Sequence, residues 1–167
     1  LKGGRLKLES SLRHGFKRLV LRQPFPRIAE FHNLSWLRAH DLPAPKPLVA
    51  CVWSLRLIAR LQFLATEWIA DAPSLLTLIE KRAPNVPDAL SATGQVVKRM
   101  HTAGFVHRNC FPRNFIVDGE GAVWILDAWR GGPKATNTAV DVQDFEARLA
   151  ELQVDPTPFR DGYASGV

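Results

Sequence analysis

The segment that decides the fold reads HRNCFPRN at residues 107–114, followed by FIV at 115–117, DGEG at 118–121 and AVWIL at 122–126. An Asp-Gly pair between two β-rich runs predicts a hairpin with a tight turn at 118–121. Asp127 ends the second predicted strand. The two strands of a hairpin run antiparallel, so the start of the first lies beside the end of the second. The pattern therefore brings Asn114 and Asp127 to one edge.

Asn114 and Asp127 together make a candidate magnesium site. Mg²⁺ takes few protein oxygens and completes its shell with phosphate oxygens and water. For either residue alone, the alternative is an ordinary turn or strand cap, since Asn and Asp are common there. Their ordered combination follows a predicted helix end, MHTAGFVH at 100–107, and this context favours the metal site.

The sequence resembles the lipopolysaccharide kinase family, the Kdo and core-heptose kinases. The matching motifs are HRNCFPRNF at 107–115 and ILDAWR at 125–130, with AEF at 29–31 and LPAPKPL at 42–48 upstream. The resemblance implies an α+β, protein-kinase-like bilobal fold. Residues 1–69 would form a partial, small β-rich N-lobe that ends in the hinge. Residues 70–167 would form a mainly helical C-lobe that carries the catalytic-loop hairpin.

The same resemblance implies an ATP-dependent kinase that phosphorylates a hydroxyl of a lipopolysaccharide core sugar, Kdo or heptose. Its cofactors would be ATP and Mg²⁺. His107, Asn109 and Asp127 occupy the catalytic positions, and Asn114 and Asp127 the metal-binding ones, with Asn114 also at the nucleotide. Asp144 in the following helix is a candidate support for the catalytic loop. An exposed helix carboxylate is the alternative for Asp144.

The remaining nucleotide-binding positions fall in the first 69 residues. Glu30 matches the helix glutamate that orients a nucleotide-binding lysine, and Lys2 is our choice for that lysine. Lys7 and Lys17 are rivals, and a solvated surface lysine is the alternative. The segment 66–69, with Glu67 and Ile69, resembles the hinge whose backbone pairs with adenine; an ordinary strand end is the alternative.

Two departures from the family pattern bear on activity. Asn109 stands where these kinases carry an Asp that accepts the substrate hydroxyl proton, and an amide has no useful basicity. Losing a positioned base typically costs about 10²–10⁴-fold in rate. In addition, no G-x-G-x-x-G precedes Lys2, and the chain starts at Leu1 without a signal-peptide pattern. We therefore expect an N-terminally truncated kinase domain.

The rest of the chain alternates apolar periodicity with breaks. We expect strand or loop at 5–21, a helix at 27–40 with Glu30 at the edge of its buried face, and an extended connection at 43–47. Two strands follow at 48–53 and 61–66 with a loop or short hairpin at 55–60. Helices are predicted after an N-cap at Ser74 through 81, at 88–102 and at 142–152, before a Pro-containing tail.

Length and composition limit the function classes. The chain has 167 residues with 46% hydrophobic and 23% charged residues, the profile of one globular domain. It excludes a coiled coil and a collagen-like repeat, and no apolar run is long enough for a transmembrane helix. Two cysteines, Cys51 and Cys110, imply neither a zinc site nor a disulfide framework. We expect a cytoplasmic, reducing compartment.

The net charge of +6 favours anionic partners, although it also fits simple solubility. Residues 1–40 hold nine Lys or Arg and two Glu. We expect a sugar or glycolipid acceptor and peripheral contact with the acidic face of the inner membrane. No nucleic acid is expected, because the five Trp form no basic–aromatic platform. A pseudokinase scaffold that lacks the catalytic Asp is the main alternative, and a small-molecule phosphotransferase of aminoglycoside or choline type is another.

Overall fold

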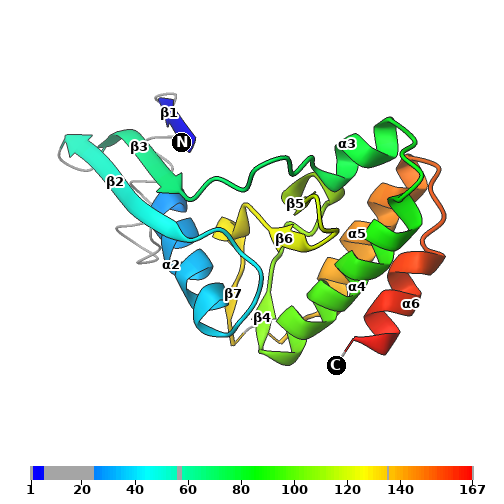
Figure 1. Cartoon of the computed structure of the whole chain (residues 1–167). Helices are drawn as coiled ribbons and strands as arrows, with labels where there is room; N and C mark the ends of the chain where they lie inside the picture. Colours follow the sequence, from blue (N-terminus) through cyan, green and yellow to red (C-terminus); the bar gives the residue numbers. More distant parts are fainter. Residues whose placement is uncertain (1, 6–24, 56–57, 135, 167) are drawn as a thin grey trace.

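The computed structural model describes residues 2–5, 25–55, 58–134 and 136–166, and it consists of a small sheet-and-helix part beside a mainly helical part (Figure 1). The small part holds three antiparallel strands in the order β1-β3-β2 with one helix packed on them. Its elements are β1 (Lys2–Arg5), α2 (Pro26–Ala39), β2 (Pro47–Leu55) and β3 (Ile58–Thr66). This arrangement agrees with the predicted α+β bilobal class.

The β2–β3 hairpin is longer than the sequence predicts. Leu55 pairs with Ile58, so the ladder extends into the segment 55–60, where the sequence predicts a loop or a short hairpin, and the hairpin alternative is the one observed. Ile58 and Ala59 extend β3 beyond the predicted start at 61, and they pair with Leu55 and Ser54 of β2. In β1, Lys2 pairs with Leu64 and Gly4 with Gln62. The expected strand or loop at 5–21, with Lys7 and Lys17, lies almost entirely outside the described residues.

The helical part is built around α4 and the short hairpin. Its helices are α3 (Leu75–Glu80), α4 (Val86–Thr102), α5 (Ala139–Glu151) and α6 (Thr157–Ser165). Its strands pair as β4 (Phe105–Val106) with β7 (Gly132–Pro133) and as β5 (Phe115–Val117) with β6 (Val123–Ile125). Two short 3₁₀ turns, η1 (Pro112–Asn114) and η2 (Ala128–Arg130), precede β5 and follow β6.

Several predicted boundaries are confirmed. Ser74 caps α3, and its Oγ accepts a hydrogen bond of 3.1 Å from the Thr77 amide. The helix predicted at 88–102 begins two residues earlier and ends at Thr102, and Gly104 follows with a φ of 87°. The hairpin strands and the turn at 118–121 lie where the sequence predicts them. Both cysteines are free, with Cys51 exposed and Cys110 buried.

The Pro-containing tail that the sequence predicts after residue 152 contains a helix that the sequence analysis does not predict. Residues 157–165 form α6, which packs along α4 (Figure 1). Asp155 begins the helix by accepting the Thr157 amide at 2.9 Å, and Phe159 stacks on Phe145 with ring centroids 4.2 Å apart. Burial of Phe159 therefore outweighs the low helix propensity of a segment that contains Pro158 and Gly162.

The helices α4 and α6 cross so closely that each needs a glycine at the contact. A Cβ on Gly94 would lie 2.2 Å from the Phe159 carbonyl oxygen, and a Cβ on Gly162 would lie 2.0 Å from the Ser91 carbonyl oxygen. Real Cβ atoms do not approach backbone oxygens to such distances, so both positions require glycine.

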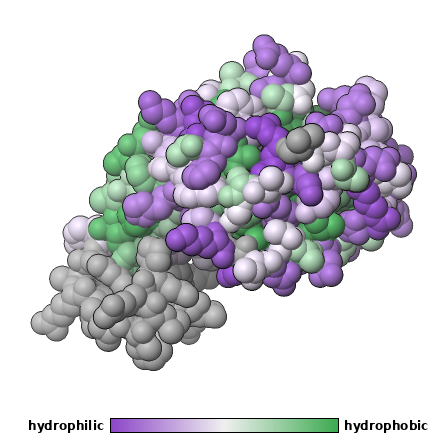
Figure 2. Space-filling view, turned by 90° about the horizontal axis from the view of Figure 1, so that it is seen from below, coloured by the Kyte–Doolittle hydropathy of each residue, from purple (hydrophilic) through white to green (hydrophobic). Residues whose placement is uncertain are grey.

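Large apolar side chains remain exposed on the small part. Trp53 is 57% exposed, Leu48 58%, and Trp68, just after β3, 86%. Figure 2 shows hydrophobic residues gathered at the end of the molecule that this part forms. Within the described residues, no helix is both long and apolar enough to cross a bilayer.

Candidate active site

The β5–β6 hairpin brings Asn114 and Asp127 to one edge, as the sequence predicts. The Leu126 amide donates to the Asn114 carbonyl oxygen at 2.8 Å, which joins the end of η1 to the residue before Asp127. At the other end of the hairpin, Asp118 Oδ1 accepts the amides of Glu120 and Ala122 at 3.1 and 2.9 Å. The turn is therefore fixed by its own side chain, and this sets the strand register that positions the edge.

Three polar side chains meet at this edge. Asn114 Nδ2 donates to the Asn109 carbonyl oxygen at 2.7 Å, and Asn109 Nδ2 donates to Asp127 Oδ2 at 3.1 Å. Asn109 and Asn114 are 4% and 5% exposed. Asp127 has a left-handed backbone, with φ of 57° and ψ of 36°. Asp is one of the few non-glycine residues that tolerates this conformation.

The donor set fits Mg²⁺. Because Asn114 uses its Nδ2 on the Asn109 carbonyl, its Oδ1 is the atom left for a ligand. The Asp127 carboxylate adds a charged oxygen, and magnesium typically uses one or two carboxylates and completes its shell with phosphate and water. Among the described residues there is no group of three or more His, Cys, Asp or Glu side chains that could hold a metal. A site built from Asn114 and Asp127 would take its other ligands from phosphate oxygens and water.

Helix α2 delivers Glu30 to the same region. Its side chain is 1% exposed, deeper than the edge position that the sequence predicts. Arg27 Nη1 lies 2.5 Å from Glu30 Oε2 and 3.8 Å from Asp127 Oδ1, so one guanidinium adjoins both carboxylates. The Arg27 amide also donates to Gln62 Oε1 at 3.1 Å, which ties the start of α2 to β3.

The start of the predicted catalytic loop is anchored by Asp141 of α5, a residue that the sequence analysis does not identify. Asp141 is fully buried, and its Oδ2 and Oδ1 accept the amides of His107 and Arg108, each at 2.7 Å. His101 Nε2 lies 3.0 Å from Asp141 Oδ2. The sequence names Asp144 as the candidate support, but it lies one helical turn further along α5 and is partly exposed. The sequence feature that could have identified Asp141 is its position as an acidic residue in the first turn of α5.

The ring of His107 lies beneath the loop. It is fully buried, and its Nε2 donates to the Leu126 carbonyl oxygen at 2.9 Å. Its Nδ1 has no hydrogen-bond partner among the described residues. Burial lowers the pKa of His107, against smaller opposing effects of the Leu126 carbonyl and of Asp141. The neutral ring therefore joins the catalytic loop to the end of β6.

The predicted hinge residues follow β3 directly. Glu67 is turned back onto the strand connection, where its Oε1 accepts the Lys46 amide at 2.7 Å and its own amide donates to the Lys46 carbonyl oxygen at 2.9 Å. Ile69 is half-buried. The structure thus links the segment after β3 to the segment before β2 and gives the Glu67 carboxylate a structural partner.

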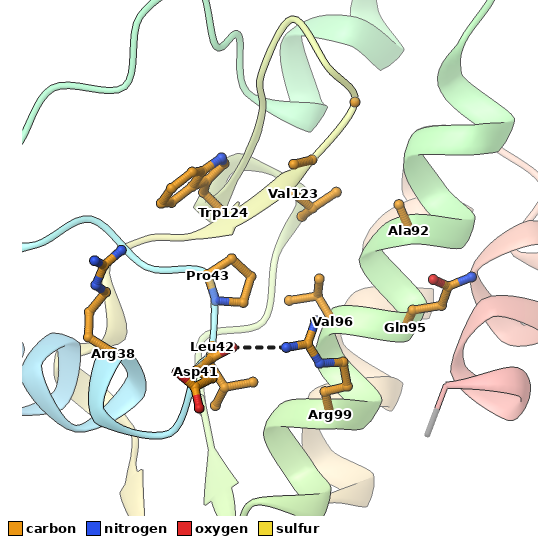
Figure 3. Close-up of a pocket in the computed structure, with 12 residues that line it drawn as sticks. Arg38, Asp41, Leu42, Pro43, Ala92, Gln95, Val96, Arg99, Val123 and Trp124 are labelled. Atoms are coloured by element: carbon orange, nitrogen blue, oxygen red, sulfur yellow. Dashed lines mark hydrogen bonds between the residues drawn. The ribbon is translucent and has the colours of Figure 1, made fainter.

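A surface pocket of about 490 Å³ lies at the turn end of the hairpin (Figure 3). Arg99 reaches across it from α4, and its Nη2 donates to the Asp41 carbonyl oxygen at 2.9 Å. On another wall, Trp124 Nε1 donates to Asp118 Oδ2 at 2.8 Å. None of the predicted site residues lines this pocket. It is therefore separate from the edge that carries Asn114 and Asp127.

Comparison with known proteins agrees with the resemblance seen in the sequence. The model of the Lipopolysaccharide kinase (Kdo/WaaP) family matches residues 10–158. A 3-deoxy-D-manno-octulosonic acid kinase of Vibrio vulnificus (strain YJ016) is 30% identical over 107 residues, which cover 64% of this chain and 44% of that protein. One of Stenotrophomonas maltophilia (strain R551-3) is 30% identical over 126 residues, covering 74% and 49%. The chain thus spans about half the length of the curated relatives it matches.

A solved structure supports the fold assignment. "WaaP in complex with acyl carrier protein" superposes with a TM-score of 0.66 at 17% sequence identity, covering 83% of this chain and 66% of that one. At this identity the likeness establishes the fold alone. Together with the two-part architecture, it confirms the protein-kinase-like α+β class.

Proposed function

Because the chain belongs to the lipopolysaccharide kinase (Kdo/WaaP) family, we propose that the full-length protein transfers the γ-phosphoryl group of ATP to a sugar hydroxyl of the lipopolysaccharide core. The observation that carries this proposal is the hydrogen-bonded set of Asn109, Asn114 and Asp127 at one hairpin edge. Both curated relatives described above are named for Kdo, so Kdo is the first acceptor to test and heptose the second.

In this proposal Asn114 Oδ1 and the Asp127 carboxylate hold Mg²⁺. A magnesium ion held there would supply positive charge to neutralise the charge that develops on the transferred phosphate. The chain contributes rigidity: Asn109 orients Asp127 through its amide, and the Leu126–Asn114 backbone bond keeps the two ligand-bearing residues adjacent. Asp141 and neutral His107 act as positioning residues that hold the loop to α5 and β6.

The residues before 70 would hold the nucleotide, as the N-lobe, with residues 70–167 as the C-lobe. Lys2 is the proposed phosphate-binding lysine, and its backbone pairing with Leu64 supports this choice. Leu64 is buried and lies on the same face of β3 as Gln62, whose Oε1 accepts the Arg27 amide of α2. Glu30 would orient that lysine. The backbone at Glu67 and Ile69 would pair with adenine, because the Glu67 side chain is engaged with Lys46.

Asn109 decides how fast such an enzyme can be. Its Nδ2 is used on Asp127, so its Oδ1 remains to accept a hydrogen bond from an acceptor hydroxyl. It cannot take the proton as a carboxylate would. Phosphoryl transfer depends mainly on positioning and charge neutralisation, which allows a slow reaction without a strong base.

A pseudokinase that keeps the fold as a binding module is the second candidate, and Asn109 is the observation that favours it. The two are separated by incubating the full-length protein with ATP, Mg²⁺ and Kdo-bearing lipid A and following phosphate transfer. Turnover by the wild type excludes the scaffold function. If only Asn109→Asp turns over, the natural protein is the pseudokinase.

The metal site is tested independently of turnover. We expect ATP with Mg²⁺ to raise the Tm of the wild type and to have much less effect on Asp127→Ala. Glu120→Ala, at an exposed position in the turn of the hairpin, is the control for a lost carboxylate. Equal responses of wild type and Asp127→Ala would contradict the assignment of Asn114 and Asp127.

The acceptor also indicates where the protein works. A glycolipid acceptor and the excess of basic residues in 1–40 support a cytoplasmic protein that contacts the acidic face of the inner membrane peripherally. This contact is a proposal in its own right, and it does not depend on which sugar is phosphorylated.

A further inference from the structure

Helix α2 is fastened to the turn that follows Asp127 by one buried amide. Asn33 is 9% exposed, and its Nδ2 donates to the Ala128 carbonyl oxygen at 2.8 Å and to the Gly131 carbonyl oxygen at 3.0 Å. A side-chain amide has two N–H groups, so both donors of Asn33 are used on this one segment.

These two bonds hold both ends of the turn η2. Ala128 is the first residue of η2, and Gly131 directly follows its last residue. Asp127 precedes the turn and has a left-handed backbone. Such a conformation is strained for a non-glycine residue and persists only where the surroundings fix it. Asn33 is the side chain that fixes the residue next to Asp127, so the direction of the Asp127 carboxylate depends on α2.

The far end of the turn reaches the catalytic loop. A Cβ on Gly131 would lie 2.4 Å from the Val106 carbonyl oxygen and 2.9 Å from that of His107. The Gly131 backbone therefore packs directly on the chain that enters the loop at 107–114. Through Gly131, Asn33 links α2 to this chain as well as to Asp127.

We propose that Asn33 is a positioning residue that locks the Asp127 carboxylate and the catalytic loop to helix α2. This inference rests on the proposed function, because Asp127 matters as a ligand of Mg²⁺ there. Glu30 lies one helical turn before Asn33 on the same helix. The two hydrogen bonds of Asn33 therefore keep Glu30 and Asp127 in one arrangement.

The test uses the full-length protein with Asn33→Leu, which is similar in size and lacks both donors, and Asn33→Ser, which keeps one. The first measurement is the Mg²⁺ concentration that half-saturates the ATP-dependent rise in Tm. Losing a partner that orients a metal ligand typically costs about 10–100-fold in metal affinity. We expect a rise of about that size for Asn33→Leu and a smaller one for Asn33→Ser.

A second measurement detects the lock itself. Amide hydrogen exchange in the peptide covering 128–131 should accelerate in Asn33→Leu, with exchange at 118–122 unchanged. If the sugar kinase is active, kcat should fall while the KM for the sugar stays at the wild-type value, because Asn33 acts on the metal side of the reaction.

Thr93→Ala is the matched control, since Thr93 is fully buried and its Oγ1 donates to the Ala89 carbonyl oxygen within α4, outside the site. It should lower the Tm without changing the Mg²⁺ requirement.

The lock is overturned if Asn33→Leu keeps the wild-type Mg²⁺ requirement, or if Thr93→Ala raises it equally. If the wild type binds Mg·ATP but phosphorylates no sugar, the proposed function fails while the Mg²⁺ titration still decides the lock. If it binds no Mg·ATP, the exchange at 128–131 decides it.

Discussion

At the scale of single residues, the site depends on amide and imidazole side chains whose hydrogen bonds leave each of them one way to act. Asn109 uses its N–H on Asp127, and Asn114 uses its N–H on the Asn109 backbone. Asn109 Nδ2 lies 3.1 Å from Asp127 Oδ2. An Asp at position 109 would therefore place a second negative charge at about this distance from the Asp127 carboxylate. A carboxylate pair so close disfavours double ionisation unless a cation lies between them. Restoring the base therefore also makes the site more dependent on Mg²⁺.

The buried His107 predicts a pH dependence of stability. Burial lowers the pKa of His107 in the folded protein, so the unfolded chain binds a proton more readily. The free energy of unfolding should therefore fall as the pH drops below about 6.5, the ordinary histidine pKa, and continue to fall until the folded-state pKa is reached.

The measurement is urea unfolding of wild type and His107→Phe between pH 8 and pH 5.5. His107→Phe should be less stable at pH 8, because the Leu126 carbonyl loses its donor, but its stability should vary less with pH. An identical pH dependence in the two proteins would show that another group is responsible.

At the scale of elements, α5 supports the catalytic loop through Asp141. In Asp141→Asn one of the two backbone amides faces an N–H group in place of an oxygen. An unsatisfied buried donor costs about 1–3 kcal/mol. We expect a loss of stability in that range together with reduced Mg·ATP binding, measured by urea unfolding and by thermal shift.

Asp144→Asn on the same helix is the control, because no hydrogen bond joins Asp144 to the loop among those described. It should change stability by no more than about 0.5 kcal/mol, as exposed substitutions generally do. Equal effects of the two variants would contradict the anchoring role of Asp141.

The α4–α6 crossing gives a second prediction at this scale. Gly162→Ala places a methyl group 2.0 Å from the Ser91 carbonyl oxygen, so the helices must separate. Overpacking of this kind costs about 1–3 kcal/mol. Urea unfolding should detect the loss, whereas Gly119→Ala, where a Cβ meets nothing within 4 Å, should be near neutral.

What the sequence could predict follows from the range of the interactions. The hairpin was predictable because Asp118, through its side chain, and Gly121, with a φ of 83°, specify its turn locally, and the adjacency of Asn114 and Asp127 follows from the turn. The role of Asp141 was not, because its bonds join residues 33 or more positions apart in the chain. α6 was missed for a related reason: its Gly162 weakens the helix locally and is required only by contact with α4.

At the scale of the whole molecule, charge and exposed apolar residues coincide in the first part of the chain. Residues 1–40 are strongly basic, and Leu48 and Trp53 of β2 and Trp68 just after β3 are exposed. Each Lys or Arg near an anionic lipid surface contributes about 1 kcal/mol, and aromatic side chains favour the interface.

We therefore expect the full-length protein to sediment with vesicles that contain anionic lipid and to be released as salt is raised. Trp53→Ser should weaken this binding, and neutral vesicles serve as the control. Binding that is equal on neutral and anionic vesicles, or unaffected by salt, would contradict electrostatic attachment to the membrane.

The close crossing of α4 and α6 also has a consequence for how the protein is made. Ser91 and Gly162 meet in the folded chain but leave the ribosome 71 residues apart. Until α6 has been synthesised, α4 exposes a groove that fits a helix and presents apolar surface to the cell. The helical part can therefore complete its folding only after α6 has left the ribosome, and α4 is the segment on which a chaperone would act in the interval.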